Sequence, residues 1–424
     1  MQNRTILLLG SGGREHALAR KLAASPRTDR LFVAPGNAGT ADLATHLDLD
    51  IADHDAIERA VRDHGIDLLV VGPEAPLVAG IADRFADADV GVIGPSAAGA
   101  QLEGSKAFAK AFMARHDIPT AGSIEVDADS LDTGLDRIDA TSGPYVLKAD
   151  GLAAGKGVLI IDDAREAKEA LREMIEEARF GDASRTVVIE DFLQGTEFSV
   201  FALVDGTNYA LLPHAKDYKR VGEGDTGLNT GGMGAISPVP FVDDDLMATV
   251  EERIVRPTVR GLAAEDLDYV GFVYFGLIHT ADGPKVIEYN CRMGDPETQV
   301  VMARLENDLV DLFDACLAGT LDQMTVRHST LHGATVVLAS GGYPGSYAKG
   351  KAIDLPEPGR DQRIDLAGVR LDDQGRPVTS GGRVLAVTSL ASDLPTAVQR
   401  SNDLAAQVRF EGAFFRGDIG WEFV

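Results

Sequence analysis

Short apolar runs alternate with amphipathic helical patterns over the first hundred residues of the chain. Such alternation is typical of βαβ units, which form a parallel sheet with helices on both faces. We therefore predict an N-terminal α/β domain. Its expected strands are Thr5–Leu9, Leu31–Val33, Leu68–Val71 and Val90–Ile93, and its expected helices are Glu15–Ala24, His54–His64 and Val78–Asp87.

The pattern changes after a long helical stretch that begins near Gly104 and ends at Arg115. Strands then follow one another at short spacing, which favours an antiparallel α+β unit. The glycine-rich segment 222–234 predicts a flexible connection, and the pair Asp282-Gly283 predicts a hairpin turn. The expected strands are Tyr145–Ala149, Val158–Ile161, Thr186–Asp191, Glu197–Val204, Gly271–His279 and Pro284–Asn290, and the expected helices are Ala164–Arg179, Asp243–Ala264 and Glu297–Leu317.

The last quarter of the chain predicts a smaller α+β domain, with strands at Ala334–Ala339 and Val384–Ser389 and a helix at Leu394–Val408. A chain of 424 residues exceeds what one hydrophobic core usually serves. We therefore expect a multidomain protein of α/β and α+β class. Its expected parts are a Rossmann-like parallel-sheet domain over residues 1–103, a central domain over 104–325 and a small C-terminal α+β domain over 326–424.

Acidic side chains outnumber basic ones, with 66 Asp and Glu against 40 Lys and Arg and a net charge of −26. A field of this sign repels nucleic acid and anionic lipid, so neither is expected as a partner, and an anionic substrate must meet local cations. The two cysteines cannot build a disulfide framework, and no apolar run reaches the ~20 residues of a membrane helix. The first apolar run, Ile6–Leu9, is too short for a signal peptide, so we expect a cytoplasmic protein.

The junction between the first strand and the first helix is rich in glycine, with the sequence Gly10-Ser11-Gly12-Gly13-Arg14-Glu15. Glycines here let a phosphate approach the backbone at the positive end of a helix. The dinucleotide fingerprint fits poorly, because Glu15 replaces its last glycine and residues 31–37 offer no acidic ribose acceptor, which disfavours an NAD-dependent oxidoreductase. A phosphomonoester site is the functional interpretation, and a tight turn that needs glycine only for its backbone angles is the alternative.

A second glycine-rich loop, Asp150–Gly157, lies between two predicted strands. It contains Gly155-Lys156-Gly157, but a strand follows it where a P-loop requires a helix. Two interpretations stay open. The loop is either a closing lid over nucleotide phosphates, with Lys148 just before it, or the tip of an ordinary β-hairpin.

Glu288 and Asn290 lie two residues apart in a predicted strand, so both side chains project from one face. A carboxylate and an amide oxygen suit Mg²⁺, which also binds substrate phosphates. A solvated strand face is the alternative, but the polar segment Cys291–Glu297 favours a site. Zinc is not expected, because His328 and His332 have no His-Glu-x-x-His or Cys-x-x-Cys partner. No motif for a protein nucleophile appears, so we expect chemistry between bound substrates.

Six segments of the sequence, taken in order, closely resemble the glycinamide ribonucleotide synthetase family of ATP-grasp enzymes. They are Gly10–Ala17, Val33–Thr40, Gly72–Leu77, Lys148–Gly157, Asn229–Ala235 and Asn290–Gln299. The match extends from Leu7 to Trp421. The resemblance implies that the central domain is an ATP-grasp domain with a mobile subdomain at about 121–195.

The same resemblance implies the reaction. ATP phosphorylates the carboxylate of glycine, and the amine of 5-phosphoribosylamine attacks the glycyl phosphate to give glycinamide ribonucleotide, ADP and phosphate in purine biosynthesis. The implied co-substrate is ATP, and the implied cofactor is Mg²⁺ or Mn²⁺. We expect a monomer that makes transient contact with the preceding enzyme of the pathway.

The resemblance also assigns roles to individual residues. Arg292, Asp217 and Lys148 are implied catalytic residues, with Arg292 bound to the glycine carboxylate, and Glu288 and Asn290 are implied metal ligands. The implied ATP-binding residues are Lys106, Lys148, Gly151, Gly155, Lys156, Gly157, Glu190, Phe192, Leu193 and Glu197. The implied substrate-binding residues are Gly10, Gly12, Gly13, Gly36, Asn37, Glu74, Arg292 and Asp295.

Some positions depart from the family pattern. Tyr218 and Leu228 stand where histidine and proline are expected, which bears on the rigidity of their loop. Phe275 and Gly276 stand where many ATP-grasp enzymes carry a carboxylate, so a second metal would need another ligand such as Glu297. The alternative functions are another ATP-grasp ligase and a nucleotide-binding protein without turnover, and the retained lysines and metal ligands disfavour the second.

Overall fold

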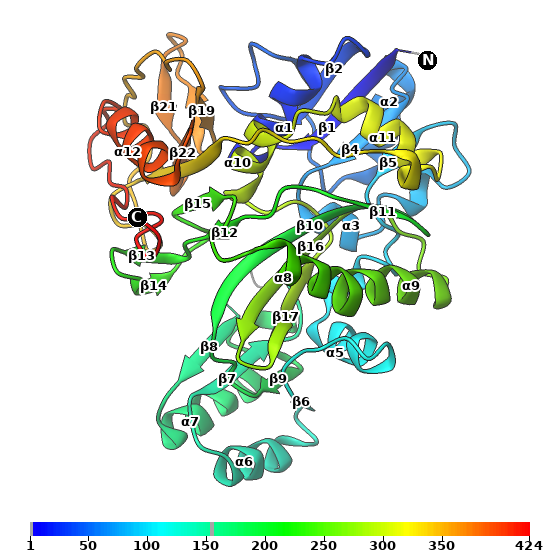
Figure 1. Ribbon diagram of the computed structural model, residues 1–424, viewed down its shortest axis with the longest axis vertical. Coiled ribbons are helices and arrows are strands. Elements are labelled where there is room, and N and C mark those ends of the chain that lie inside the picture. The colour runs from blue at the N-terminus through cyan, green and yellow to red at the C-terminus, as the bar shows by residue number, and fades with distance from the viewer. Residues whose placement is uncertain (1–2, 153–156) are drawn as a thin grey trace.

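The computed structural model describes residues 3–152 and 157–424 (Figure 1). Its N-terminal domain contains a five-stranded parallel sheet in the order β3-β2-β1-β4-β5, which confirms the predicted sheet type. The elements are β1 (Arg4–Gly10), α1 (Gly13–Ala23), β2 (Thr28–Pro35), β3 (Thr45–His46), α2 (His54–His64), β4 (Leu68–Val71), α3 (Glu74–Val78) and β5 (Gly91–Ile93).

Alternate residues of β1 enter two different cores, which explains why this strand is apolar almost throughout. Leu7 and Leu9 belong to the cluster that contains Ile57 of α2. Leu8 belongs to the cluster that contains Leu18 of α1. Helices therefore cover both faces of the sheet, as the pattern predicts.

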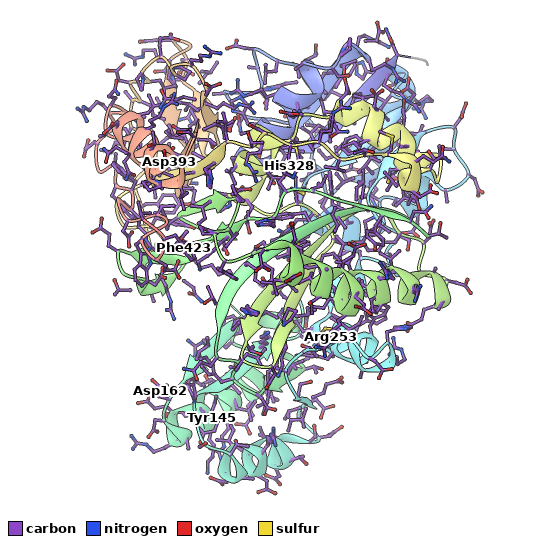
Figure 2. The ribbon with its side chains drawn as sticks, viewed as in Figure 1. Tyr145, Asp162, Arg253, His328, Asp393 and Phe423 are labelled. Carbon is purple, nitrogen blue, oxygen red and sulfur yellow. The ribbon has the colours of Figure 1, made fainter. Side chains whose placement is uncertain are left out.

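The lower part of Figure 1 is a four-stranded sheet in the order β6-β9-β7-β8, which shares one core with α6 and α7. Tyr145, labelled in Figure 2, marks the start of β7. The elements are β6 (Ser123–Val126), α6 (Leu131–Ala140), β7 (Tyr145–Ala149), β8 (Val158–Ile161), α7 (Ala164–Glu176), a 3₁₀ turn (Gly181–Ser184) and β9 (Val187–Glu190).

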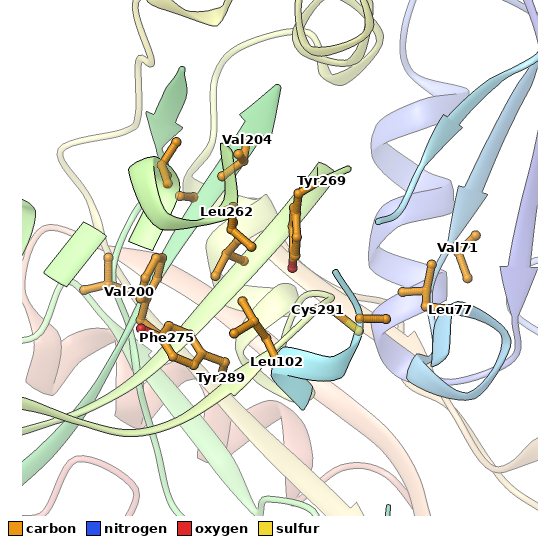
Figure 3. Close-up of a cluster of buried hydrophobic side chains, with 14 of the residues drawn as sticks. Val71, Leu77, Leu102, Val200, Val204, Leu262, Tyr269, Phe275, Tyr289 and Cys291 are labelled. Atoms are coloured by element: carbon orange, nitrogen blue, oxygen red, sulfur yellow. The ribbon is translucent and has the colours of Figure 1, made fainter. Parts of the chain in front are cut away.

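An antiparallel sheet in the order β11-β10-β16-β17 forms the centre of the molecule. Its strands are β10 (Thr196–Asp205), β11 (Tyr209–Leu211), β16 (Val270–Thr280) and β17 (Gly283–Asn290). One face packs against α8 (Asp244–Val250), a π-helical turn (Glu251–Val255) and α9 (Arg256–Ala264), and the other packs against α10 (Glu297–Arg304) and α11 (Leu309–Leu317). Figure 3 shows the first core continuing from Val200 and Leu262 to Val71 and Leu77 of the N-terminal domain.

The C-terminal domain contains an antiparallel sheet in the order β12-β15-β18-β22-β19, and α12 (Leu394–Ala405) packs on it. Two of its strands, β12 (Lys216–Asp217) and β15 (Gly234–Ser237), come from the central part of the sequence. The sheet therefore joins the central and C-terminal domains. The other elements are β18 (His332–Ala339), β19 (Gln362–Leu366), β20 (Val369–Leu371), β21 (Pro377–Thr379), β22 (Arg383–Ala391) and a 3₁₀ turn (Leu321–Gln323).

The helix predicted at Val78–Asp87 is wrong. The chain is helical earlier, over α3, and Gly80 then adopts a φ of +83° beyond the helix end. A short 3₁₀ turn, Asp83–Phe85, follows. Glycine accommodates positive φ most readily, so Gly80 is the stop signal that the apolar pattern does not contain.

The single helix predicted at Glu297–Leu317 is two helices. α10 ends at Arg304, and Asp308 begins α11 as an N-cap whose carboxylate accepts hydrogen bonds from two backbone N–H groups of the next turn. The helical stretch predicted near 104–115 is α5 (Lys106–Arg115), and its N-cap Ser105 separates it from the short helix α4 (Gln101–Gly104). Asp and Ser are favoured N-caps because their side chains satisfy N–H groups that the helix cannot.

The segment 222–234, predicted as a flexible connection, contains part of a hairpin. β13 (Arg220–Gly222) pairs with β14 (Thr226–Asn229). The buried guanidinium of Arg416 fixes this hairpin, because it donates to the Asp225 carboxylate at 2.7 Å and to the Arg220 carbonyl at 3.0 Å. The contact bridges almost two hundred positions of sequence, so local pattern could not reveal it.

His16 of α1 connects the N-terminal and C-terminal domains. Its Nδ1 accepts a hydrogen bond of 2.8 Å from the backbone N–H of Leu366 at the end of β19. Burial, reinforced by the charge of Arg20, lowers the pKa of His16 to about 3. The imidazole is therefore neutral in the folded protein over the physiological pH range.

We expect His16 to make the folded protein sensitive to acid. Because its folded pKa lies below the ordinary value of 6.5, its contribution to stability is complete above that pH and is lost as the pH falls toward the folded pKa. His16→Asn keeps an acceptor near the Nδ1 position but cannot be protonated. Urea unfolding at about pH 8 and about pH 4 gives the decrease in the free energy of unfolding between these pH values for each protein. This decrease should be about 3 kcal/mol smaller in His16→Asn than in the wild type. Equal losses in the two proteins would contradict this role.

Candidate active site

The strand β17 places two polar side chains on one face at the centre of the molecule. Glu288 and Asn290 lie opposite Gly276 and Tyr274 of β16. Neither side chain forms a hydrogen bond or an ion pair with any residue in 3–152 or 157–424. A shift of register leaves Ile287 as a bulge, and its carbonyl accepts a hydrogen bond of 3.1 Å from a nearby lysine of β7. Bulges of this kind often aim side chains at active sites.

These two side chains fit a magnesium ion. Their oxygens are hard donors without a protein partner, and Mg²⁺ commonly takes one or two such ligands and completes its shell with water and substrate phosphates. Among the described residues, no group of three or more histidine, cysteine or acidic side chains encloses a metal position. The donor set therefore suits an ion that binds together with a phosphate.

Three lysines converge beside this strand. Lys148 of β7 and Lys110 of α5 both pair with the Glu190 carboxylate, at 2.9 and 3.2 Å. The ammonium group of Lys106 donates to the Gly151 carbonyl at 3.2 Å. Burial lowers the pKa of Lys110 to about 8 and also lowers that of Lys106, despite the opposing charges of Glu190 and Glu288. Buried ammonium groups interact strongly with phosphate groups, because little water is present to screen their charges.

The implied ATP-binding residues after β9 follow Glu190, the carboxylate that pairs with Lys148 and Lys110. Phe192 is exposed and lines a cavity of about 450 Å³ together with Glu190. Leu193 belongs to the short connection to β10, where Glu197 pairs with Lys219 at 2.8 Å.

Of the glycine-rich loop, the structure describes residues 150–152 and Gly157. The implied phosphate contacts Gly155 and Lys156 lie outside the described residues. The lid interpretation of Asp150–Gly157 therefore stays a prediction.

Asp217 and Glu297 form a buried acidic pair near Glu288. The ammonium group of Lys219 lies 3.7 Å from the Asp217 carboxylate. Burial raises the pKa of Asp217, and burial together with the Asp217 charge raises the pKa of Glu297 to about 7. A carboxyl group that titrates near neutrality can exchange a proton with a substrate during a reaction.

Arg292, two residues after Asn290, is held between two carboxylates. Its Nη2 donates to Glu103 at 2.7 Å, its Nε to Glu74 at 3.2 Å and its Nη1 to the Met293 carbonyl at 3.3 Å. A guanidinium has five N–H groups. Each terminal nitrogen therefore keeps one N–H without a protein acceptor among the described residues, which is the fork that a substrate carboxylate requires.

Glu74 and Glu103 differ in their surroundings. The Glu103 side chain is almost fully buried, and burial raises its pKa although Arg292 opposes the shift. Glu74 is more exposed, and there burial, which would raise the pKa, is outweighed by the combined effect of Arg292, a backbone hydrogen bond and Arg14, so the pKa is lowered. Glu74 is therefore the ionised partner that a ligand can reach. Glu103 instead holds Arg292 in place and accepts a hydrogen bond of 2.8 Å from the backbone N–H of Cys291.

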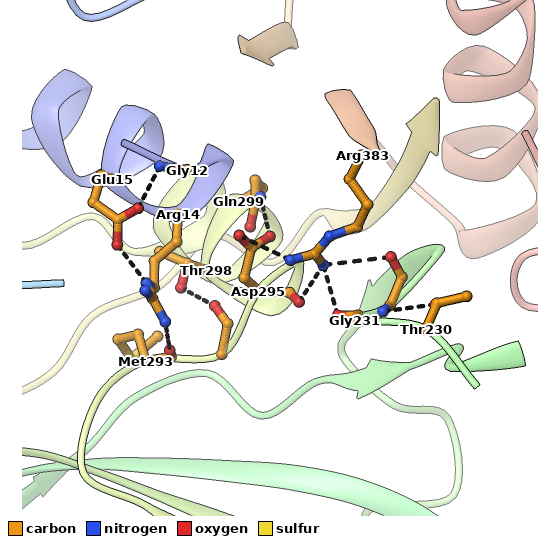
Figure 4. A network of polar contacts seen from close by, with 12 residues as sticks. Gly12, Arg14, Glu15, Thr230, Gly231, Met293, Asp295, Thr298, Gln299 and Arg383 are labelled. Carbon is orange, nitrogen blue, oxygen red and sulfur yellow. Dashed lines mark hydrogen bonds and ion pairs between the residues drawn. The ribbon is translucent and has the colours of Figure 1, made fainter. Parts of the chain in front are cut away.

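The N-terminal glycine junction is held by carboxylates of the chain itself (Figure 4). Gly10 has a φ of +126°, and a Cβ there would lie 2.4 Å from Cγ of Glu15, so only glycine fits. The Gly12 N–H donates to the Glu15 carboxylate at 2.7 Å. The backbone N–H of Arg14 interacts with the Asp295 carboxylate, whose pKa is lowered because nearby cations outweigh burial. The positive end of α1 thus already faces two anions of the protein.

Arg383 ties the C-terminal domain to this junction. Its guanidinium lies 3.3 Å from the Asp295 carboxylate and donates to the carbonyls of Asp295 and Gly231 at 2.7 and 2.6 Å (Figure 4). The start of β22, which carries Arg383, is therefore joined to the segment that follows Glu288 and Asn290.

A cavity of about 740 Å³ lies between the N-terminal and C-terminal domains. Four implied substrate residues line it, namely Gly12, Gly36, Asn37 and Asp295. Gly13, the first residue of α1, does not line the cavity. Glu74 and Arg292 belong to the neighbouring group in which Arg292 is held by Glu74 and Glu103. The implied substrate residues thus fall into two adjacent groups, which sequence order alone does not separate.

The departures from the family pattern have structural consequences. Tyr218 is buried, and its hydroxyl donates to Glu422 at 3.0 Å, so its loop is anchored to the C-terminal segment. Leu228 is 66% exposed on β14 and packs little. Gly276, where a carboxylate is common in ATP-grasp enzymes, faces Glu288 directly.

Sequence reasoning missed three residues that shape the site. Lys110 follows Lys106 by four positions on α5, and this spacing, which puts side chains on one helix face, was the available signal. Glu103 and Arg383 act through contacts distant in sequence and gave no local signal.

Comparisons with known proteins cover nearly the whole chain. The models of the phosphoribosylglycinamide synthetase N domain, ATP-grasp (A) domain and C domain match residues 4–103, 104–298 and 333–422. The chain is 47% identical to the phosphoribosylamine–glycine ligase of Vibrio cholerae and 48% identical to that of Pseudomonas aeruginosa, in both cases over 99% of this chain and 98% of the relative.

Solved structures agree with this result. The crystal structure of phosphoribosylamine–glycine ligase from Thermotoga maritima matches with a TM-score of 0.86 and 36% identity, over 98% of this chain and 99% of that one. The biotin carboxylase domain of 2-oxoglutarate carboxylase from Hydrogenobacter thermophilus matches with a TM-score of 0.75 at 17% identity, over 98% and 92% of the two chains, and shares the fold. Among the helices of the described residues, none combines the length and apolar character that a bilayer crossing requires.

Proposed function

The chain belongs to the phosphoribosylglycinamide synthetase family, and on that premise we propose that it joins glycine to 5-phosphoribosylamine while ATP is cleaved to ADP and phosphate. A glycine carboxylate oxygen attacks the γ-phosphorus of ATP, and the bond to the β-phosphate oxygen breaks. The amine nitrogen then attacks the glycyl carbonyl, loses a proton and expels phosphate. Both cysteines are free and buried, which suits the reducing cytoplasm in which we place the reaction.

The observation that carries the proposal is the adjacency of two unlike groups on one short segment. Glu288 and Asn290 offer ligands for a phosphate-bound metal, and Arg292 offers a fork for a carboxylate. Phosphoryl transfer to a carboxylate needs these two groups close together, because catalysis depends on positioning and on neutralising charge. No protein nucleophile is required.

We assign the nucleotide to the lysine side of the site. Lys106 and Lys148 would contact its phosphates, and Glu288 and Asn290 would hold Mg²⁺. When bound, Mg²⁺ supplies positive charge to the transferred phosphoryl group. Lys110 and Lys148 share the single negative charge of Glu190. Part of the positive charge of Lys148 is therefore available to a phosphate.

We assign glycine to Arg292 and Glu74. Glycine is a zwitterion, so a free guanidinium fork for its carboxylate and an ionised carboxylate for its ammonium group complement it. Asp217, with its raised pKa, is the proposed acceptor of the proton that the attacking amine loses.

Initial rates of ADP formation test the proposal. ADP should form rapidly only when glycine, 5-phosphoribosylamine and Mg-ATP are all present, and each ADP should be matched by one glycinamide ribonucleotide. Equal rates with another amino acid, or ADP release that ignores the amine, would identify a different ATP-grasp ligase. Tight ATP binding without any turnover would identify a nucleotide-binding protein.

A further inference from the structure

The cavity between the N-terminal and C-terminal domains is lined by two arginines in different states. Arg383 is engaged by the Asp295 carboxylate and by backbone carbonyls. Arg370 of β20 lines the same cavity, and its guanidinium has neither an ion pair nor a hydrogen bond within residues 3–152 and 157–424. Arg370 is therefore the cation of this wall that is left for a ligand.

The opposite wall supplies neutral donors but little positive charge. The positive end of α1 is already used, because Glu15 accepts the Gly12 N–H and Asp295 faces the Arg14 N–H. Ser11, whose side chain carries a neutral hydroxyl, also lines the cavity. Since the whole chain carries a net charge of −26, its overall field repels an anionic ligand, and a phosphate here needs a local counter-ion.

We propose that this cavity binds the phosphate monoester end of the amine substrate, with the Arg370 guanidinium as its counter-ion and the Ser11 and Ser380 hydroxyls as neutral donors. This inference rests on the proposed function, because it gives a place to the phosphate of that substrate. A guanidinium matches two phosphate oxygens at once, and about 740 Å³ is ample for a phosphorylated pentose. Asp295 lines the cavity three residues after Arg292, so a substrate held here lies beside the glycine site.

The proposal makes the C-terminal domain part of the substrate site. Arg370 lies on β20, and the wall that it shares with Ser380 and Arg383 belongs entirely to this domain. The N-terminal domain contributes the facing wall through Ser11, Gly12 and Asn37. The phosphate site is therefore complete only when both domains are in place.

The test compares Arg370→Ala and Arg370→Lys with the control Arg376→Ala. Arg376 follows β20 on the same hairpin, but it pairs with Asp372 at 2.9 Å and does not line the cavity. Arg370→Ala should raise the KM for 5-phosphoribosylamine about 10- to 100-fold and leave the KM for ATP and glycine unchanged. Arg370→Lys should recover part of the loss, and Arg376→Ala should behave as the wild type.

Ribose 5-phosphate serves as a stable probe of the same cavity. It should compete with the amine substrate in the wild type, and its inhibition constant should rise in Arg370→Ala by the same factor as the KM. Ribose, which lacks the phosphate, should inhibit both proteins equally.

The outcomes separate this inference from the function on which it rests. A folded and active Arg370→Ala variant with an unchanged KM for the amine overturns the inference and leaves the ligase function intact. An equal rise of KM for all three substrates also overturns it, because that pattern indicates a general structural change. If the wild type does not ligate glycine, the proposed function fails, and calorimetry of ribose 5-phosphate binding to the wild type and Arg370→Ala still decides the phosphate site.

Discussion

Glu288→Ala is expected to lower kcat about 100- to 1000-fold at saturating substrates while the protein stays folded. The carboxylate is a proposed ligand of the ion that balances charge on the transferred phosphoryl group. The fold does not depend on it, because its side chain has no hydrogen bond or ion pair in the described structure and faces Gly276. The free energy of unfolding should therefore change by less than about 0.5 kcal/mol.

Steady-state rates over a range of Mg²⁺ concentrations, with urea unfolding in parallel, check this expectation. Glu125→Ala is the matched control, since Glu125 is an exposed strand glutamate of the neighbouring sheet. The control should keep wild-type kinetics. Near wild-type turnover of Glu288→Ala at saturating Mg²⁺ would remove Glu288 from the metal site.

Arg292→Lys is expected to raise the KM for glycine about 100-fold, with little effect on the KM for ATP. An ammonium group keeps the positive charge that Glu103 and Glu74 require but lacks the planar fork that takes both oxygens of a carboxylate. The lysine variant should therefore fold. Arg292→Met should in addition lose about 3–5 kcal/mol of stability, because it leaves the buried Glu103 without a cation.

Glycine and ATP saturation curves, together with thermal unfolding, separate these effects. In Glu103→Gln, the partner of Arg292 becomes neutral and the guanidinium remains, so KM for glycine should change much less than in Arg292→Lys. A normal KM for glycine in a folded Arg292→Lys variant would show that the carboxylate binds elsewhere.

Local sequence pattern was enough for the main strands of the N-terminal domain and for the shared face of Glu288 and Asn290, whose role as metal ligands stays a prediction. The apolar runs of the N-terminal domain and the period of two in β17 depend only on residues close in the chain, and the structure has both as expected. Helix ends were harder, because one residue decides them. Gly80 and Asp308 each end or begin a helix within an otherwise continuous apolar pattern.

The partners of the site residues could not be predicted from sequence in the same way. Lys148 contacts Glu190 because β7 pairs with β9 in a register that places Lys148 opposite Val188. The sequence of one strand alone determines neither this pairing nor its register. The contact between Arg292 and Glu103 depends on the packing of two domains. The family resemblance supplied the roles of such residues, and their partners came from the structure.

The most direct test of the account follows the oxygen atoms of glycine. With glycine labelled by oxygen-18 in its carboxylate, one labelled oxygen should appear in the released phosphate for each glycinamide ribonucleotide formed, because the carboxylate attacks the γ-phosphorus and one of its oxygens leaves with it. Mass spectrometry of the phosphate measures this ratio. Unlabelled phosphate, formed at the same rate as the product, would contradict a glycyl phosphate intermediate and with it the proposed mechanism.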